Sequence, residues 1–249
     1  MSSKPYPLVA VVLAAGKGKR MKSDLPKVLH LLAGKPIIEH VLDTLRELDI
    51  DKTVVVVGHQ AERVIDAISR FGVSFAEQKQ QLGTGHAVQM TEEQLSDFDG
   101  DVVVLAGDVP MLRAETVKNL LAEHRKRGAV ATVLTAMLPD PTGYGRIVRD
   151  PGGMILKIVE HKDASDDERR ISEINTGIFV FEKKRLFEAL SRVDNENSQG
   201  EYYLTDVMQI FLEQGLPTAG YCAEDYRETV GVNSTDELER LEALMGKSF

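Results

Sequence analysis

Short runs of β-branched residues alternate with amphipathic stretches along the first half of the chain, and this alternation restricts the fold most. Apolar runs occur at 8–13 (LVAVVL), 53–58 (TVVVVG) and 101–108 (DVVVLAGD). After Pro36, a favoured first residue of a helix, apolar residues recur at helical spacing over 37–48. This pattern is typical of a parallel sheet covered by helices. We therefore predict an α/β fold with a Rossmann-like, mostly parallel sheet flanked by helices.

Shorter patterns extend this outline, and their rhythm changes after about residue 140. We predict further strands at 73–77, 130–136 and 174–181, a β-hairpin over 145–161, a loop or short helix at 163–170, and helices at 61–70, 86–95, 113–127, 202–215 and 235–245. The chain has no internal repeat and no linker-like segment. We expect a single α/β domain over 1–249 with a β-rich insertion in its second half.

The composition excludes several classes of protein. The 249 residues carry a formal net charge of −9, whereas a general nucleic-acid binder shows a basic face. No run of 18 apolar residues is present, so we expect no membrane span. The single cysteine, Cys222, cannot form an internal disulfide, and the first residues lack a secretory signal pattern. We predict a cytoplasmic protein without nucleic-acid or membrane partners.

The most cationic stretch of this acidic chain, LAAGKGKRMKSDLPKVLH at 13–30, directly follows the first predicted strand. A P-loop needs Gly, four residues and then Gly-Lys-Ser/Thr, and neither Gly16 nor Gly18 begins such a run. A dinucleotide fingerprint needs a third glycine where Met21 stands and an acidic residue after the second strand, which is followed by His59 instead. A third design is a loop whose backbone N–H groups wrap a triphosphate.

The side chains of this loop suit the third design. Small residues at 14–16 let the backbone approach an anion. Arg20 offers a fork that matches phosphate oxygens, and Lys27 offers a movable point charge. The alternative is a solvated basic turn. Pro26 argues against that alternative, because the rigid step before Lys27 sets this lysine at the start of an apolar helical turn.

Eight motifs distributed over nearly the whole chain resemble those of the sugar-nucleotide pyrophosphorylases, a family of nucleotidyltransferases. They occur in that family's order: LAAGKGKRMKSDLPKVLHLLAGKP, EQKQQLGTGHAV, GDVPML, PTGYGRIVRD, IVEHKDAS, EINTGIFVF, NSQGEYYLTDV and VGVNS. Within the family, they are most similar to the uridylyltransferase half of the bifunctional N-acetylglucosamine-1-phosphate uridylyltransferase / glucosamine-1-phosphate acetyltransferases. QLGTGHA and EINTG are the most specific of these motifs.

The resemblance implies a nucleotide-diphospho-sugar transferase fold with a nucleotide-binding half (1–138), a sugar-binding half (139–230) and a C-terminal helix (231–249). It implies transfer of UMP from UTP to N-acetylglucosamine 1-phosphate, with release of pyrophosphate and with Mg²⁺ as cofactor. The hexapeptide repeats that form a left-handed β-helix in the bifunctional proteins do not occur in this sequence. We therefore expect no β-helix, no acetyltransferase activity, and a monomer or weak oligomer.

Particular residues match the family's functional positions. The resemblance implies catalytic roles for Arg20, Lys27 and Asp108, and metal binding by Asp108 and Asn233. It implies nucleotide binding by Leu13, Ala14, Ala15, Gly16, Lys27, Gln78, Gly83 and Thr84. It implies sugar binding by Ala106, Gly107, Gly145, Glu160, Asn175 and Asn233. The chemistry of the residues agrees: a carboxylate at the carboxyl edge of a parallel sheet suits Mg²⁺, and a glutamine amide, which can both donate and accept, suits the imide edge of uracil.

Structural roles are the alternatives at several of these positions. Asp108 or Thr116 could cap the helix at 111–127, and Asn233 could cap the helix at 235–245. Glu160, beside a histidine and a lysine, could be part of a surface charge pair.

Two functional alternatives also stay open: a pyrophosphorylase for another sugar 1-phosphate or nucleotide, and a non-catalytic sugar-nucleotide sensor. Ala106 bears on the first, because close members of the family carry tyrosine there.

Overall fold

Strand β1 (Leu8–Leu13) lies inside the sheet, and its first five side chains are buried. The computed structural model of the chain describes residues 6–245. β1 pairs in parallel with β4 (Lys52–Val57) on one side and with β6 (Asp101–Ala106) on the other. β5 (Ser74–Glu77) extends the parallel ladder beyond β4. The four strands predicted in the first 110 residues are confirmed, and together they form the parallel part of the sheet.

The second half of the chain continues the same sheet. β10 (Glu173–Glu182) lies antiparallel between β6 and β7 (Ala131–Met137), with a register shift between Asn175 and Phe179. The full strand order is β11-β7-β10-β6-β1-β4-β5. The predicted hairpin is confirmed as β8 (Gly145–Arg149) and β9 (Ile155–Val159), and β8 also pairs with β10. One sheet therefore contains strands from both predicted halves.

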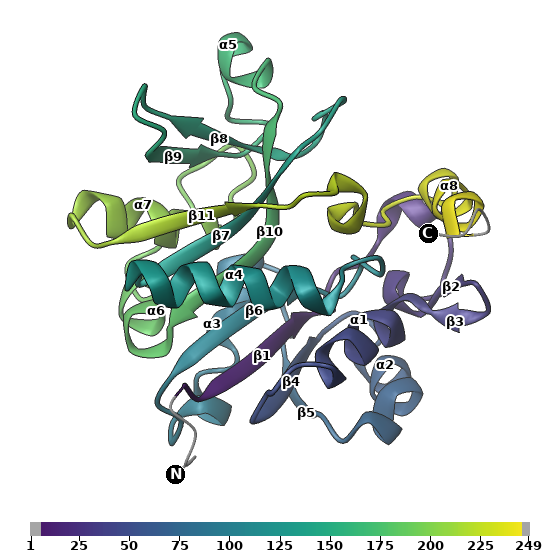
Figure 1. Cartoon of the computed structure of the whole chain (residues 1–249). Helices are drawn as coiled ribbons and strands as arrows, with labels where there is room; N and C mark the ends of the chain where they lie inside the picture. Colours follow the sequence, from purple (N-terminus) through teal and green to yellow (C-terminus); the bar gives the residue numbers. More distant parts are fainter. Residues whose placement is uncertain (1–5, 246–249) are drawn as a thin grey trace.

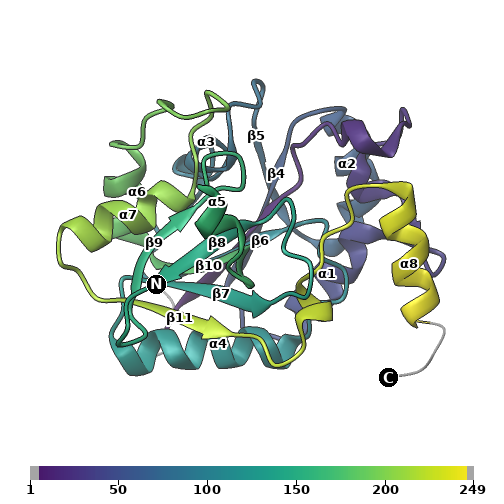
Figure 2. The same ribbon diagram turned by 90° about the horizontal axis from the view of Figure 1, so that it is seen from above.

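Helices cover both faces of the sheet (Figures 1 and 2). One face packs against α1 (Ile37–Arg46), α2 (Ala61–Ile68) and α4 (Ala114–Arg127). The other packs against α3 (Thr84–Gln89), α6 (Lys183–Leu190) and α7 (Thr205–Glu213). Figure 2 shows α4 and α7 on opposite sides of the sheet. The predicted arrangement of a sheet between helix layers is confirmed.

Some elements differ from the sequence prediction. The predicted helix at 86–95 is wrong in extent: α3 ends at Gln89, and a separate 3₁₀ turn covers Glu93–Leu95. The sequence analysis missed α6 and the edge strand β11 (Thr218–Cys222), which pairs in parallel with β7. The remaining short elements are β2 (Leu31–Leu32), β3 (Lys35–Pro36), α5 (Asp166–Arg169) and 3₁₀ turns at Lys19–Met21, Lys27–Leu29, Ser69–Phe71 and Tyr226–Thr229.

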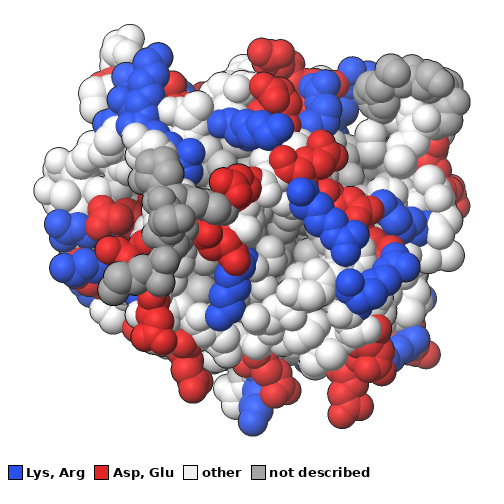
Figure 3. Space-filling view, turned by 60° about the horizontal axis from the view of Figure 1, so that its bottom comes forward, with Lys and Arg blue, Asp and Glu red and all other residues white. Residues whose placement is uncertain are grey.

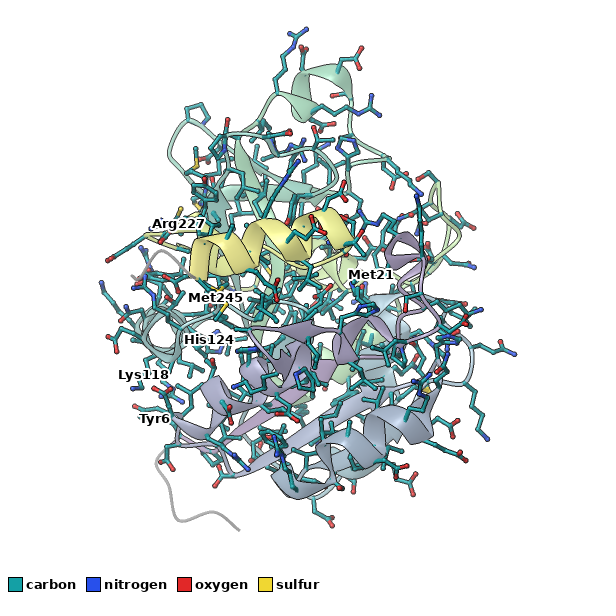
Figure 4. All side chains as sticks on the ribbon, turned by 90° about the vertical axis from the view of Figure 1, so that its right-hand side faces the viewer. Tyr6, Met21, Lys118, His124, Arg227 and Met245 are labelled. Atoms are coloured by element: carbon teal, nitrogen blue, oxygen red, sulfur yellow. The ribbon has the colours of Figure 1, made fainter. Side chains whose placement is uncertain are left out.

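Helix α8 (Thr235–Met245) packs beside the glycine-containing loop rather than on the sheet (Figures 1 and 4). Its Leu241 joins a small buried cluster with Met21 and Val232, which also contains Leu32 and Ile37. Met21, the residue that breaks the dinucleotide fingerprint, is 2% exposed in this cluster. The end of the described chain thus holds the far side of the loop in place.

The surface is mixed in charge. On the face shown in Figure 3, the Lys and Arg side chains of the described residues are interspersed with Asp and Glu side chains. Among the helices of residues 6–245, none has the length and apolar character needed to cross a membrane.

Candidate functional site

The loop after β1 leaves the sheet at its carboxyl edge, held by backbone hydrogen bonds. The Gly107 N–H donates to Leu13 O (2.9 Å), and the Ala14 N–H donates to Val56 O (2.8 Å). Gly18 has a φ of 56°, and a Cβ there would lie 2.7 Å from Lys27 Cβ. Glycine at position 18 therefore permits both the left-handed turn and the close approach of Lys27.

A cavity of about 720 Å³ opens between this loop and the segment after β5. All of the predicted nucleotide-binding residues line it: Leu13, Ala14, Ala15, Gly16, Lys27, Gln78, Gly83 and Thr84. Asp108 and Ala106 also line it. This first cavity has the position that ligands occupy in open α/β sheets, at the carboxyl ends of the strands.

A second cavity of about 340 Å³ adjoins the first. Five of the six predicted sugar-binding residues line it: Ala106, Gly145, Glu160, Asn175 and Asn233. The two cavities share three lining residues: Leu13, Thr84 and Ala106. The small side chain of Ala106 leaves the passage between the two cavities open. Two ligands bound in these cavities would therefore meet beside Ala106.

Lys27 joins residues from distant parts of the chain. Its Nζ donates to the Asp108 carboxylate and, over 3.0 Å, to Asn233 Oδ1. The side chains of Lys27 and Asp108 are only 17% and 15% exposed, so this pair is largely shielded from water. The Val232 N–H donates to Asp108 O (2.8 Å), which fixes the segment that carries Asn233. The predicted helical turn that begins at Lys27 is confirmed as a 3₁₀ turn.

The capping alternatives for Asp108, Thr116 and Asn233 are wrong. α4 begins after Arg113 and has no side-chain cap, and Thr116 donates instead to Glu228. The first turn of α8 uses Ser234 Oγ, which accepts from the Glu237 N–H (3.3 Å).

Two of the predicted site residues line neither cavity. Arg20 is exposed on the 3₁₀ turn Lys19–Met21. Gly107 has a structural reason to be glycine, because a Cβ there would lie 3.0 Å from Leu13 O.

Glu160 lies in the second cavity and is not part of a surface charge pair. It accepts a hydrogen bond from Thr205 Oγ1 (3.3 Å). Burial raises the pKa of Glu160, the nearby carboxylates of Asp206 and Asp163 raise it further, and the Thr205 bond acts against them. A Cβ on Gly145 would come within 3.3 Å of Glu160 Oε2, so glycine leaves this carboxylate accessible.

The turn at 83–85 is joined to the segment before α7. The Gly85 N–H donates to Tyr202 O and the Tyr202 N–H to Leu82 O, both over 2.8 Å. A Cβ on Gly83 would lie 2.5 Å from Tyr202 O, which makes glycine necessary there. Thr84 Oγ1 accepts from the Leu204 N–H (3.0 Å) and so aligns the start of α7 with this turn.

Sequence reasoning missed two contributors. Thr205, which holds Glu160, begins α7 and lies inside the motif NSQGEYYLTDV, but the sequence analysis assigned it no role. The sequence analysis does not single out His86, whose Nδ1 contacts the amide of Gln78 at 3.0 Å. The turn at 83–85 separates Gln78 from His86 in the sequence. A tight turn at this point could have suggested that the two side chains meet.

The Asp108–Asn233 pair suits Mg²⁺. One carboxylate oxygen and one amide oxygen already surround a single cation, the Lys27 ammonium. Both are hard oxygen donors, and Mg²⁺ takes one or two protein ligands and completes its shell with water and phosphate oxygens. Residues 6–245 contain no group of three or more His, Cys, Asp or Glu side chains arranged for a metal, so an all-protein cage is absent from this part of the chain.

Comparisons with known proteins agree with this geometry. The chain is 50% identical to the bifunctional protein GlmU of Lactococcus lactis subsp. lactis (strain IL1403) and 52% identical to that of Shouchella clausii (strain KSM-K16). Each match extends over 238 residues and covers 96% of this chain and 52% of the relative. The chain thus spans about half the length of these relatives.

A solved structure and a family model give the fold and the family. A UDP-glucose pyrophosphorylase complexed with UDP-glucose has a TM-score of 0.78 and 17% identity, covering 98% of this chain and 100% of that one. The model of the MobA-like NTP transferase domain matches residues 10–206. The chain therefore belongs to the family of MobA-like NTP transferase domains, whose members are nucleotidyltransferases.

Proposed function

We propose that this chain transfers UMP from UTP to N-acetylglucosamine 1-phosphate, giving UDP-N-acetylglucosamine and pyrophosphate. The observation that carries the proposal is the meeting of two cavities at Leu13, Thr84 and Ala106. Lys27 lines the first cavity and donates to Asn233, which lines the second. A triphosphate in the first cavity and a sugar phosphate in the second would bring their phosphates together there. The 50–52% identity to the GlmU proteins supports the choice of uridine and of the N-acetylated sugar.

The reaction needs no protein nucleophile. A phosphate oxygen of the sugar 1-phosphate, already ionised at neutral pH, attacks the α-phosphorus of UTP in line. The new P–O bond forms as the bond between the α-phosphorus and the bridging oxygen breaks, and pyrophosphate leaves with that electron pair. Catalysis by the protein therefore consists of positioning and of neutralising charge on the phosphates.

The loop residues would perform this neutralisation. Lys27 lines the first cavity, contacts Asn233 of the second, and would bind the α-phosphate region. The small residues at 14–16 let backbone N–H groups approach the triphosphate. Arg20 is exposed at the far end of the loop, and we assign it to the leaving phosphates. Mg²⁺ held by Asp108 and Asn233 would supply further neutralisation of phosphate charge.

The two cavities would also select the substrates. Gln78, Gly83 and Thr84 would hold uridine in the first cavity. In the second, the Glu160 carboxylate would accept from sugar hydroxyls, and the amide of Asn175 would meet the N-acetyl group. Asn175 Oδ1 already accepts from the Gly177 N–H (3.0 Å), so its NH₂ group is the part oriented for a ligand.

Pyrophosphate release across a grid of nucleoside triphosphates and sugar 1-phosphates, with and without Mg²⁺, tests the proposal. We expect the highest kcat/KM for UTP with N-acetylglucosamine 1-phosphate and no turnover without a divalent cation. A pocket that hydrogen-bonds an amide disfavours analogues that lack it, by up to about 10⁴-fold. Equal kcat/KM for glucose 1-phosphate would contradict the choice of sugar, and binding without any turnover would indicate a sensor.

A further inference from the structure

The terminal amide of Gln78 is held by two acceptors. Gln78 directly follows β5 and is 3% exposed, with its backbone N–H donating to Val57 O (2.8 Å). Its Nε2 donates to the carbonyl oxygen of Gly83 over 2.9 Å and contacts Nδ1 of His86 at 3.0 Å. Both protons of the amide nitrogen are therefore used within the protein.

These two partners determine which way the amide faces. The Gly83 carbonyl can only accept, so the Gln78 atom beside it must be the nitrogen. Burial lowers the pKa of His86, which keeps its ring neutral at neutral pH, although a hydrogen bond with the backbone of Gln80 acts against this shift. With Nδ1 accepting from Gln78, the ring proton lies on Nε2. Rotating the amide by 180° would place its oxygen against two acceptors.

The oxygen of the amide is consequently directed to the ligand. Gln78 lines the first cavity. Its Oε1 is not a sealed buried atom, and no residue in the described range 6–245 donates to it. The group presented to the cavity is thus an acceptor only. Uracil offers a donor at ring position N3, whereas cytosine offers a lone pair there and carries its donor on the exocyclic N4 instead.

We propose that His86 is a positioning residue that selects the nucleobase: it holds the Gln78 amide with Oε1 in the cavity, so that the site accepts a base with an imide N–H and rejects cytosine. This inference rests on the proposed function only in placing the base in the first cavity. His86 itself does not line that cavity. It acts through Gln78, and the Gly83 carbonyl adds a second restraint that a side-chain substitution cannot remove.

Two variants separate positioning from packing. His86→Phe keeps a ring but removes the acceptor, so that only Gly83 opposes rotation of the amide. His86→Asn keeps an acceptor atom at the place of Nδ1. Titration calorimetry of the full chain with UTP and with CTP gives the ratio of the two Kd values, and steady-state kinetics gives kcat and KM for UTP.

We expect His86→Phe to lower the preference for UTP over CTP at least tenfold, mainly by weakening UTP binding, with KM for the sugar phosphate unchanged. His86→Asn should retain most of the preference. The control is His124→Phe, which removes a buried histidine bonded to Thr132 Oγ1 (2.8 Å) on α4, outside both cavities (Figure 4). It should leave the preference unchanged even if it lowers Tm.

Two results would overturn the inference: an unchanged UTP-over-CTP preference in folded His86→Phe, or an equal loss in His86→Asn and His86→Phe. Failure of the proposed function gives a different pattern. Wild-type protein that prefers UTP in binding but uses another sugar phosphate would contradict the proposed reaction and leave the role of His86 intact.

Discussion

At the scale of single residues, Lys27 holds the two oxygens that we assign to a metal. Its ammonium contacts Asp108 and lies 3.0 Å from Asn233 Oδ1. A cation that enters between these oxygens must displace the lysine. The released ammonium would then be available to a phosphate. Binding of metal and nucleotide should therefore be coupled through this one side chain.

Lys27→Met should bind Mn²⁺ more tightly than wild type in the absence of nucleotide, by on the order of tenfold, because the competing cation is gone. The same variant should lose about a hundredfold in kcat/KM, since one preorganised charge is worth about 3 kcal/mol. Electron paramagnetic resonance of free Mn²⁺ measures the first effect. The control is Lys35→Met, which removes a lysine paired with Asp43 outside both cavities. Weaker Mn²⁺ binding in Lys27→Met would contradict the competition.

Glu160→Gln should raise Tm at neutral pH and weaken sugar-phosphate binding. Burial raises the pKa of Glu160 in the folded state, so its ionised form destabilises the fold. The gain in Tm should be full above the raised pKa, shrink as the pH falls through it, and vanish below the ordinary value of 4.5. Each kcal/mol gained raises Tm by about 2–4 °C.

Thermal melts across pH measure this effect, with Glu188→Gln on the exposed side of α6 as the control that should show no such pH dependence. A Glu160→Gln variant that is less stable than wild type at neutral pH would show that the carboxylate stabilises the fold.

The sequence predicts the identity of these residues better than their contacts. Lys27 and Asp108 could be singled out because each follows a predicted strand or a marked turn, whereas Gln78 was indicated only by the family resemblance. The bond from Lys27 to Asn233 spans 206 positions, and local spacing carries no information about such a pair. The orientation of the Gln78 amide likewise depends on His86 and on a backbone carbonyl, which no composition or periodicity reveals.

At the scale of elements, α8 supports the loop from outside the sheet. Leu241 is 3% exposed and packs in the cluster of Met21 and Val232. Val232 directly precedes Asn233 in the sequence. Loosening this contact would free both the far end of the loop and the residue that contacts Lys27. The helix therefore affects the site without lining it.

Leu241→Ala should lower the free energy of unfolding by about 2–5 kcal/mol, because it leaves a cavity in the cluster. It should also raise KM for the nucleotide, because the loop loses its packing against α8. Leu244→Ala, on the same helix but 38% exposed, should change neither quantity by much. Urea unfolding and steady-state kinetics on both variants provide the measurement. If Leu241→Ala lost stability with an unchanged KM, the cluster would have no part in placing the loop.

Strongly apolar or strongly periodic elements were predicted well, whereas α6 and β11 were missed. β1, β4 and β6 are buried on both sides, so their continuous apolar runs identify them. α6 follows β10 without an intervening turn residue, and β11 is a short edge strand with a glycine and no Val, Ile or Leu. In both cases tertiary contacts, rather than local propensity, determine the structure.

At the scale of the whole molecule, the sheet depends on a strand that arrives late in the sequence. β6 and β7 are successive strands in the sequence, but they are not neighbours in the sheet. β10 lies between them and pairs with both. A chain that ends at residue 172 lacks β10 and should fail to form a native sheet. We expect it to bind a hydrophobic dye, to scatter light at micromolar concentration and to unfold without a cooperative transition. Cooperative unfolding of this fragment would show that residues 1–172 fold without β10.

The position of β10 also matters while the ribosome is still making the protein. β6 leaves the exit tunnel well before residues 173–182 do, and its valines at 102–104 are completely buried in the finished sheet. Until β10 emerges, the nascent chain carries an apolar strand with one open edge, which is the kind of surface that pairs with other chains. Translation rate and chaperone supply should thus influence the yield of this protein more than the stability of its final fold does.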